Sequence, residues 1–453
     1  MNTGLFIGIM GALSAFYLVL GWKVSKNMKS HTDLFLAGRN LGLFSVTATL
    51  LATQIGGGMF IGTAQDPFRG ILYVIGLVLG FLILGLGVAE RFRAFNVETV
   101  GGIFAKQYNS PSLRTVCEVL SVVTLCGILL SQALATESII STFTGPNSTY
   151  LFPGLWMVIV VYTLMGGLKA VVITDLIQVG IIMAVFIGLF AYSLWVSPVS
   201  FFSSAMLPNL KSVFGQARLG TPEILRIAFV STLYSVITQD IAQRFFASKT
   251  KSIARKAALY AGIILFALTI IPFYFGIQAH IQGFAQASSP LFSILEKLVS
   301  GLPLVLAICA LMAAITSTID SLLCTVAAII CSLSGNYLRG IKQEIRISQF
   351  IILLCGVSIL VGSYYVPKQI ISVMIDSYEI SVVCLVVPIL FACFKKKEAL
   401  SSFAALLSVI GGFGGFLYSK ICTSCFIGNW GTFIAVGLSL AGYLIGDYLR
   451  PKK

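Results

Sequence analysis

The chain alternates long apolar stretches with short polar connections over almost its whole length. The stretches are repeatedly about 20 residues long, the length that a helix needs to cross roughly 30 Å of hydrocarbon. The pattern predicts an all-α polytopic membrane protein with about thirteen transmembrane helices. Their ranges are 4–22, 42–63, 71–89, 113–142, 151–168, 172–197, 223–242, 256–281, 299–334, 346–366, 370–393, 400–419 and 429–449.

Three features of this pattern bear on domain organisation. No Pro/Ser-rich linker or long polar insert divides the chain, so we expect one transmembrane domain over 1–453. The stretch 4–22 has no basic residue before it and no small-residue cleavage site after it, which argues against a cleaved signal peptide. The stretch 299–334 is too long for one straight crossing, so we expect it to extend into the cytoplasm or to include a loop.

Composition agrees with this class and excludes others. The chain is 57% hydrophobic and 10% charged, with a mean hydropathy of +0.97, far from soluble usage. Its two histidines, His31 and His280, lie neither beside a nucleophile nor at metal-ligand spacing. No GxxxxGK[ST] phosphate loop is present. We therefore expect neither an enzyme nor an ATP-driven pump, and no organic cofactor.

Basic residues are distributed unevenly between the two sets of loops. Most of the 30 Lys and Arg residues fall on one side, which places the N-terminus outside and the C-terminus in the cytoplasm. The net charge of +14 thus reflects loop bias, and we expect no nucleic-acid partner. The basic and aromatic segment 244–251 is interpreted as a cytoplasmic anchor at the lipid headgroups. We expect the protein to be a monomer in the plasma membrane, which would be the inner membrane of a bacterium.

The second stretch contains Gly56, Gly57 and Gly58 in succession. Glycine is a poor helix former, and a broken helix in hydrocarbon is tolerated only where the freed backbone groups meet protein, water or ligand. Secondary transporters use such breaks to offer backbone to an ion and a solute. A glycine face for close helix packing is the alternative. If the break is the reason, a protein with alanines at both Gly56 and Gly57 should fold normally and lose most of its transport activity.

The ninth stretch has a stripe of small and hydroxyl residues. Ala314, Ser317, Thr318, Ser321 and Thr325 share one face of a helix. The Ala314 carbonyl, the Ser317 and Thr318 hydroxyls and two carbonyls from the broken helix would make five neutral oxygens, a suitable shell for Na⁺. By itself the stripe also suits interhelical hydrogen bonds.

Acidic residues within spans are costly and are functional candidates by default. Asp175 and Asp320 are the strongest of these. Glu118, Glu137 and Asp240 lie near span ends and are interpreted as salt-bridged or solvated helix ends.

Five segments resemble one known family when they are taken in order along the chain. They are 33–39, 51–62, 166–178, 243–245 with the basic run behind it, and 314–321. Together they resemble the sodium:solute symporters, the group of proline, pantothenate and glucose carriers. The resemblance covers about residues 33–395.

The resemblance implies a leucine-transporter-like fold, an inverted repeat of five plus five helices. The repeats would span 42–197 and 223–393, with 1–41 and 400–453 peripheral. The topology agrees, because the first spans of the two repeats cross in opposite directions. Carried over, the sodium site would use the carbonyls of Ala52, Ile55 and Ala314 and the hydroxyls of Ser317 and Thr318.

The resemblance also implies roles around that site. Asp175 would help sodium to leave toward the cytoplasm, Tyr234 would be an inner substrate gate, and Asp320 is an auxiliary candidate. The substrate-binding candidates are Gln54, Gly56, Gly57, Gly58, Met59 and Tyr234.

Two departures from the family pattern restrict the solute. Gly56–Met59 replaces the Ser-Ala-Glu-Gln of sugar carriers, and Gln54 replaces the tryptophan of choline carriers, so glucose-like sugars and choline are disfavoured. A small polar solute such as an amino acid, a vitamin or a carboxylate stays open. The expected function is sodium-coupled symport by alternating access.

Two alternatives stay open beside this function. A proton-coupled carrier of the same fold would place a carboxylate in the cation site. A non-transporting sensor would need an appended soluble domain, which is not expected after Arg450.

Overall fold

The computed structural model describes residues 3–26, 30–144, 148–164, 167–196, 220–287, 289–334, 341–367, 369–421 and 430–449, and these residues are almost entirely helical. The elements are α1 (Thr3–Ser25), α2 (His31–Leu36), η1 (Ala37–Arg39), α3 (Leu43–Gln54), η2 (Gly58–Gly62), α4 (Thr63–Gln65), α5 (Pro67–Ile83), η3 (Leu84–Val88), α6 (Ala89–Phe95), α7 (Val100–Tyr108), α8 (Pro111–Thr144), α9 (Ser148–Thr163), α10 (Gly167–Val196), α12 (Thr221–Ile237), α13 (Gln239–Ala247), α14 (Lys251–Ile281), α15 (Pro290–Leu298), α16 (Leu302–Leu333), α17 (Ile341–Ser363), α18 (Ile370–Phe394), η5 (Lys397–Ala399), α19 (Ser402–Ile421) and α21 (Gly431–Tyr448).

The helices match the predicted spans closely. Among the described residues, eleven helices are long and apolar enough to cross a membrane, and a twelfth span is the pair α3 and η2–α4, bent by 50°. The remaining predicted span, 151–168, overlaps α9, a shorter apolar helix that ends at Thr163. The prediction of an all-helical polytopic membrane protein is therefore confirmed.

The central helix of the bundle is α16. In its apolar window 83% of the residues are buried, against 22% in α1 and 33% in each of α19 and α21. It runs without interruption over 32 residues, about 48 Å at 1.5 Å per residue, so it exceeds the hydrocarbon thickness. The excess length belongs to one continuous helix, and the alternative of an internal loop is wrong.

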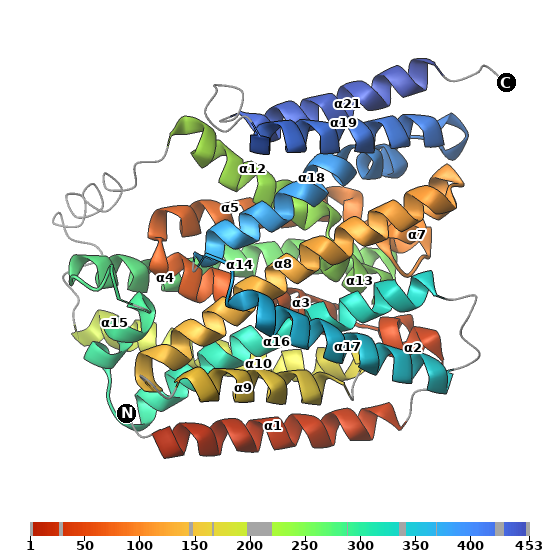
Figure 1. Cartoon of the computed structure of the whole chain (residues 1–453). Helices are drawn as coiled ribbons and strands as arrows, with labels where there is room; N and C mark the ends of the chain where they lie inside the picture. Colours follow the sequence, from red (N-terminus) through yellow and green to blue (C-terminus); the bar gives the residue numbers. More distant parts are fainter. Residues whose placement is uncertain are drawn as a thin grey trace.

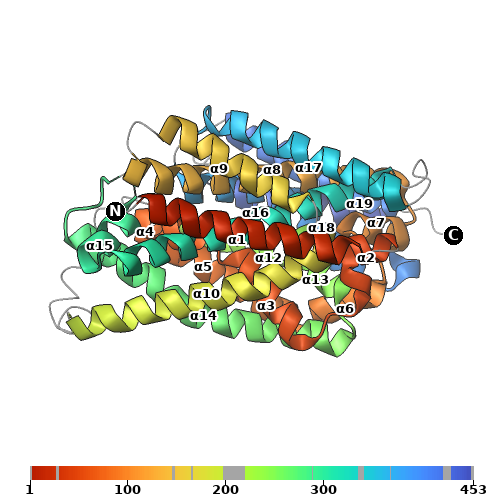
Figure 2. The ribbon, with the colours of Figure 1, turned by 90° about the horizontal axis from the view of Figure 1, so that it is seen from below.

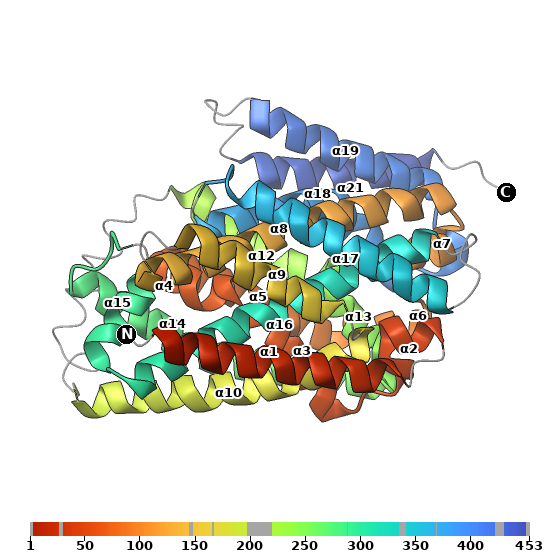
Figure 3. The same cartoon turned by 60° about the horizontal axis from the view of Figure 1, so that its bottom comes forward.

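The less buried helices lie at the edges of the bundle. Figure 1 shows α1 along one edge and the antiparallel-looking pair α19 and α21 along the opposite edge, next to α18. Seen from below, α1 crosses in front of α16, and it packs on α9, α10 and α16 (Figure 2). In the intermediate view α8, α9 and α17 form one group of neighbouring helices (Figure 3). Two long helices, α8 and α10, both pack against α16.

Two interruptions among the described residues border the candidate site, apart from a kink at Gly87 in the span Pro67–Phe95. The first interruption separates α3 from η2, as the glycine run predicts. The second separates α12 from α13 at Thr238, whose backbone is extended (φ −68°, ψ 141°). The sequence prediction treated 223–242 as one helix and missed this break. A threonine followed by an acid two residues later is typical of a helix start, and Thr238 with Asp240 provided that signal.

Candidate functional site

The hydroxyl stripe of α16 meets the broken end of α3. The Ser317 hydroxyl donates to the carbonyls of Ala52 at 3.1 Å and Ala314 at 2.8 Å. The Thr318 hydroxyl lies 3.3 Å from the carbonyls of both Thr53 and Ala314 and 3.5 Å from that of Ala52. The structure thus brings four of the five predicted sodium ligands together.

The backbone of α3 explains why these carbonyls are available. The helix ends at Gln54, and Ile55 (φ −81°, ψ 68°) leaves the helical region after its N–H has bonded to Leu51. The Gly57 N–H, which would reach the Thr53 carbonyl in a continuous helix, donates instead to Gln132 Oε1 at 2.9 Å. The Thr53 carbonyl then accepts from Thr318 on α16. Ile55, the fifth predicted ligand residue, is the residue at which the chain turns.

The donor set has the chemistry of an alkali-ion site. Ala52, Ala314, Ser317 and Thr318 are all buried, and they present hydroxyl and carbonyl oxygens without a formal charge. Hard cations prefer such oxygens, and a neutral shell suits a monovalent ion. Among the described residues no group of His, Cys, Asp and Glu could hold a metal ion of another kind. The residues present therefore fit Na⁺.

A narrow cavity adjoins this junction and is lined in part by predicted solute residues. Its wall includes Thr53, Gln54, Gly56, Gly58, Tyr234 and Thr318. Gly57 and Met59 do not line it: the Gly57 N–H faces Gln132, and the Met59 side chain is fully buried among the helices. Thr318 borders both the cavity and the hydroxyl–carbonyl cluster, so an ion and a solute would be neighbours.

The glycines at the break are also places of close packing. A Cβ atom at Gly56 would lie 2.5 Å from Thr318 Oγ1, and one at Gly57 would lie 2.4 Å from the Cβ of Ala135 on α8. Both distances are shorter than the non-bonded contacts that a Cβ atom makes in proteins, so a neighbouring group would have to move. The glycine run therefore both interrupts the helix and allows close packing. The short contacts argue against the expectation that alanines at Gly56 and Gly57 preserve folding.

Aromatic rings close one side of the cavity. The ring of Tyr234 on α12 stacks on that of Tyr378 on α18, with centroids 3.7 Å apart and planes 2° apart. The hydroxyl of Tyr378 lies 3.3 Å from that of Tyr73 on α5. Three spans therefore meet at the position assigned to the gate. Tyr73 and Tyr378 were missed, because nothing local in the sequence marks a tyrosine as a cavity residue.

Asp175 lies on α10 on the other side of α3. Its side chain is fully buried, the Thr49 hydroxyl donates to one carboxylate oxygen, and the other oxygen, Oδ1, has no hydrogen-bond partner. The Thr53 hydroxyl in turn donates to the Thr49 carbonyl at 2.8 Å. A short polar route thus runs from the hydroxyl–carbonyl cluster along α3 to Asp175.

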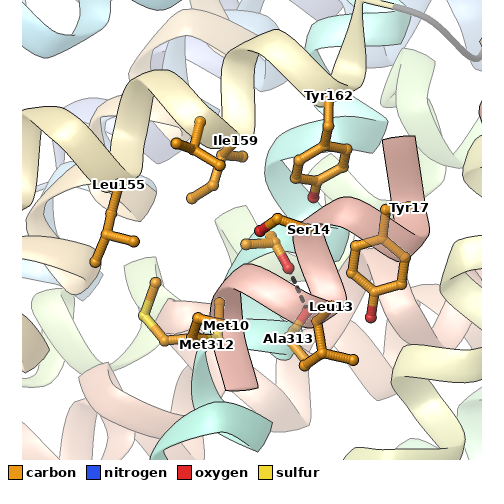
Figure 4. A pocket seen from close by; sticks show the side chains of 11 residues that line it. Met10, Leu13, Ser14, Tyr17, Leu155, Ile159, Tyr162, Met312 and Ala313 are labelled. Carbon is orange, nitrogen blue, oxygen red and sulfur yellow. Dashed lines mark hydrogen bonds between the residues drawn. The ribbon is translucent and has the colours of Figure 1, made fainter. Parts of the chain in front are cut away.

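Asp320 is held away from the narrow cavity. It accepts hydrogen bonds from the hydroxyls of Tyr162 at 2.7 Å and Thr163 at 2.6 Å, both on α9. Figure 4 shows Tyr162 and Tyr17 beside a small pocket between α1, α9 and α16, whose other labelled side chains are mostly apolar. The carboxylate is therefore part of the contact between α9 and α16.

The C-terminal part of the α16 stripe, Ser321 and Thr325, contacts α13 instead of α3. Arg244, fully buried, donates to the Ser321 hydroxyl at 2.6 Å, and the Thr325 hydroxyl donates to Gln243 at 2.9 Å. Gln243 also donates to the carbonyl of Phe35 at 2.8 Å. The headgroup-anchor interpretation of 244–251 is wrong for 244–248, which are buried, whereas 249–251 are exposed. Ser317 and Thr318 of the stripe thus belong to the hydroxyl–carbonyl cluster, whereas Ser321 and Thr325 form interhelical hydrogen bonds with α13.

Two acidic residues near span ends have different surroundings. Glu118 pairs with Arg114 at 3.1 Å, as expected. Asp240 is 3% exposed and lines the narrow cavity. The interpretation of Asp240 as a solvated or salt-bridged end is wrong, because the break at Thr238 turns this part of the chain into the bundle.

A separate ion cluster joins α12, α18 and the α19–α21 pair. Arg226 donates to Asp376 and Glu379, each at 3.1 Å, and Lys420 lies 3.2 Å from Glu379. The Thr432 hydroxyl also donates to Glu379, whose side chain is 3% exposed. The cluster supplies the charge compensation that a buried carboxylate needs.

Comparison with known proteins agrees with this geometry. The model of the family described as "Sodium:solute symporter family" matches residues 34–412. The chain belongs to the sodium:solute symporter family. Relatives of this family include a sodium/glucose cotransporter of Vibrio parahaemolyticus, 28% identical over 61% of this chain and 55% of that one. An osmoregulated proline transporter of Bacillus subtilis is 27% identical over 75% and 74%. The chain spans about half the length of the first of these relatives.

Solved structures of other carriers share the fold of this symporter family member. A Na⁺-coupled sialic acid symporter in a substrate-bound, outward-open state has a TM-score of 0.76, with 16% identity and 98% of both chains covered. The nucleobase-cation-symport-1 transporter Mhp1, closed with a bound hydantoin, has a TM-score of 0.62 over 92% of this chain and 95% of that one. The predicted leucine-transporter-like fold is confirmed.

Proposed function

We propose that the protein is a secondary active transporter that couples the symport of a small polar organic solute to sodium by alternating access. The observation that carries the proposal is the meeting of the Ser317 and Thr318 hydroxyls with the carbonyls at the broken end of α3. Membership of the sodium:solute symporter family supports it. The sodium ligands would be Ala52, Ile55, Ala314, Ser317 and Thr318.

The neighbouring residues have roles in the same scheme. A solute would occupy the narrow cavity beside Gln54, Gly56 and Gly58, next to the ion, and the Tyr234–Tyr378 stack would separate it from one side of the membrane. Sodium would leave past Asp175. Sodium bound at Thr318 stabilises a closed cavity, which couples ion and solute binding.

The two interruptions favour an inverted repeat. The repeats 42–197 and 223–393 would each begin with a broken helix, α3 with η2 and α12 with α13. The segments 1–41 and 400–453 would be peripheral. We place the N-terminus outside and the C-terminus in the cytoplasm of a bacterial inner membrane, and we expect a monomer without nucleic-acid partners.

The test uses purified protein in proteoliposomes. Binding of ²²Na⁺ is measured first, and then the uptake of a labelled panel of amino acids, vitamins and carboxylic acids under a sodium gradient or a pH gradient. We expect saturable ²²Na⁺ binding and uptake driven by the sodium gradient. Uptake driven by the pH gradient alone would favour the proton-coupled alternative instead.

A further inference from the structure

The narrow cavity contains a carboxylate for which the described residues show no direct ion pair. Asp240 lies in the first turn of α13 and lines the cavity, and no lysine, arginine or histidine is among the described residues that line it. Arg244 is one helical turn away, yet its guanidinium donates to the backbone carbonyl of Asp240 at 2.7 Å and to the Ser321 hydroxyl. Arg244 attracts the Asp240 carboxylate through space, but neither of these bonds involves a carboxylate oxygen.

A chain of hydroxyl groups holds this carboxylate. Thr238 Oγ1 contacts Asp240 Oδ1 and lies 2.5 Å from the Tyr234 hydroxyl. Because the Thr238 hydroxyl has one hydrogen, it donates to the carboxylate, and the Tyr234 hydroxyl donates to Thr238. The carboxylate is thus fixed beside the ring of Tyr234 and its stacking partner Tyr378.

Helix stability alone does not account for this residue. An acid in the first turn of a helix is favoured by about 0.3–1 kcal/mol through the helix dipole. Burial of a carboxylate without a directly bonded cation costs several times more, and the nearby Arg244 offsets only part of that cost. A neutral capping residue would have satisfied the helix without that cost. A cation that enters the cavity would therefore supply the remaining compensation.

We propose that Asp240 selects the solute and that the solute carries a protonated amine, as a small amino acid or a simple amine does. This inference rests on the proposed function and narrows its solute class. The ammonium group would donate to Asp240, and the amides of Gln54 and Gln132 in the same wall offer neutral partners for the rest of the molecule. Solutes that are anions without an amine are repelled by the same carboxylate.

The test compares compounds that differ by their amine. The thermal stability of the purified full-length carrier is measured in sodium and in potassium buffer, with L-proline against tetrahydrofuran-2-carboxylate, L-alanine against lactate, and ethanolamine against ethylene glycol. We expect the strongest stabilisation from an amine-bearing member and none from its partner. Equal or stronger stabilisation by the amine-free partners, or none by any amine, overturns the proposal.

Variants then locate the effect. Asp240→Asn removes the charge at constant size, so the apparent affinity for the best amine should fall roughly 10- to 100-fold, while stabilisation by sodium alone is kept. Glu118→Gln neutralises another buried acid, away from the cavity, and should leave amine affinity unchanged. A shifted sodium dependence with unchanged amine preference would show that Asp240 serves the ion, and would contradict the proposal. If Asp240→Asn does not fold, the wild-type comparison decides alone.

Failure of this inference and failure of the symport proposal give different results. Sodium-dependent stabilisation by amine-free solutes would retain symport and reject the amine. Amine binding of equal strength in sodium and potassium would retain the role of Asp240 and reject sodium coupling.

Discussion

The Ser317 hydroxyl donates a 3.1 Å hydrogen bond to the carbonyl of Ala52, a residue 265 positions earlier in the chain. This contact joins the central helix α16 to the helix that the glycine run interrupts. It can form because the break removes the Gly56 N–H from its helical position below Ala52. The hydroxyl and the carbonyl thus become available to a cation through the same distortion.

Loss of this hydroxyl should weaken sodium binding. In Ser317→Ala one oxygen ligand is absent, and we expect the sodium concentration for half-maximal uptake to rise roughly 5- to 150-fold, the equivalent of about 1–3 kcal/mol. Sodium titration of uptake in proteoliposomes measures it. Ser363→Ala is the matched control, because that buried hydroxyl bonds to Leu360 in its own helix. Unchanged sodium dependence in both Ser317→Ala and Thr318→Ala would reject the assignment.

Neutralisation of Asp175 should affect turnover more than binding. One oxygen of its carboxylate accepts a hydrogen bond from Thr49, and the other has no hydrogen-bond partner. The carboxylate lies at the end of the polar route that leads from the hydroxyl–carbonyl cluster along α3. Asp175→Asn should slow uptake per carrier while equilibrium solute binding stays near wild type, because the change would act on sodium release and not on capture. Paired binding and uptake assays on one preparation measure the two. Lost binding with normal turnover of the bound fraction would place Asp175 within the binding site.

Gly56 and Gly57 should respond differently to alanine. In Gly57→Ala the new methyl group meets Ala135 on the neighbouring helix, so we expect a loss of about 1–3 kcal/mol in stability. In Gly56→Ala it meets the Thr318 hydroxyl, so the sodium requirement should rise as well. Gly180→Ala, with open space around it, is the control and should be neutral or slightly stabilising. Thermal unfolding and uptake of each variant decide; a fully stable Gly57→Ala would contradict the packing argument.

The Arg226 cluster should contribute strongly to stability. Arg226→Gln leaves the buried Glu379 with less compensation, and we expect a loss of about 3 kcal/mol. Glu379→Gln in the same background should recover part of that loss, because the uncompensated charge disappears. A double-mutant cycle on thermal unfolding measures the coupling. Strictly additive losses would show that the two side chains do not interact.

Much of the fold follows from local sequence. Apolar stretches of membrane-spanning length can satisfy their backbone only as helices, so their positions were predictable to within a few residues. The glycine run at Gly56 predicted a break for the same local reason. The second break at Thr238 was missed, because the apolar pattern of 223–242 is long enough for one span and outweighed the helix-start signal of Thr238 and Asp240.

What the sequence by itself determined was the helical class, the interruption of the second span and the hydroxyl face of α16. Each of these depends on backbone propensity or on periodicity within one segment. The tertiary structure decided which members of that face meet α3 and which meet Arg244 and Gln243. It also decided that Asp240 faces a cavity beside Tyr234 and Tyr378. These pairings join residues from distant spans, and a periodic pattern within one helix carries no information about the helix that packs against it.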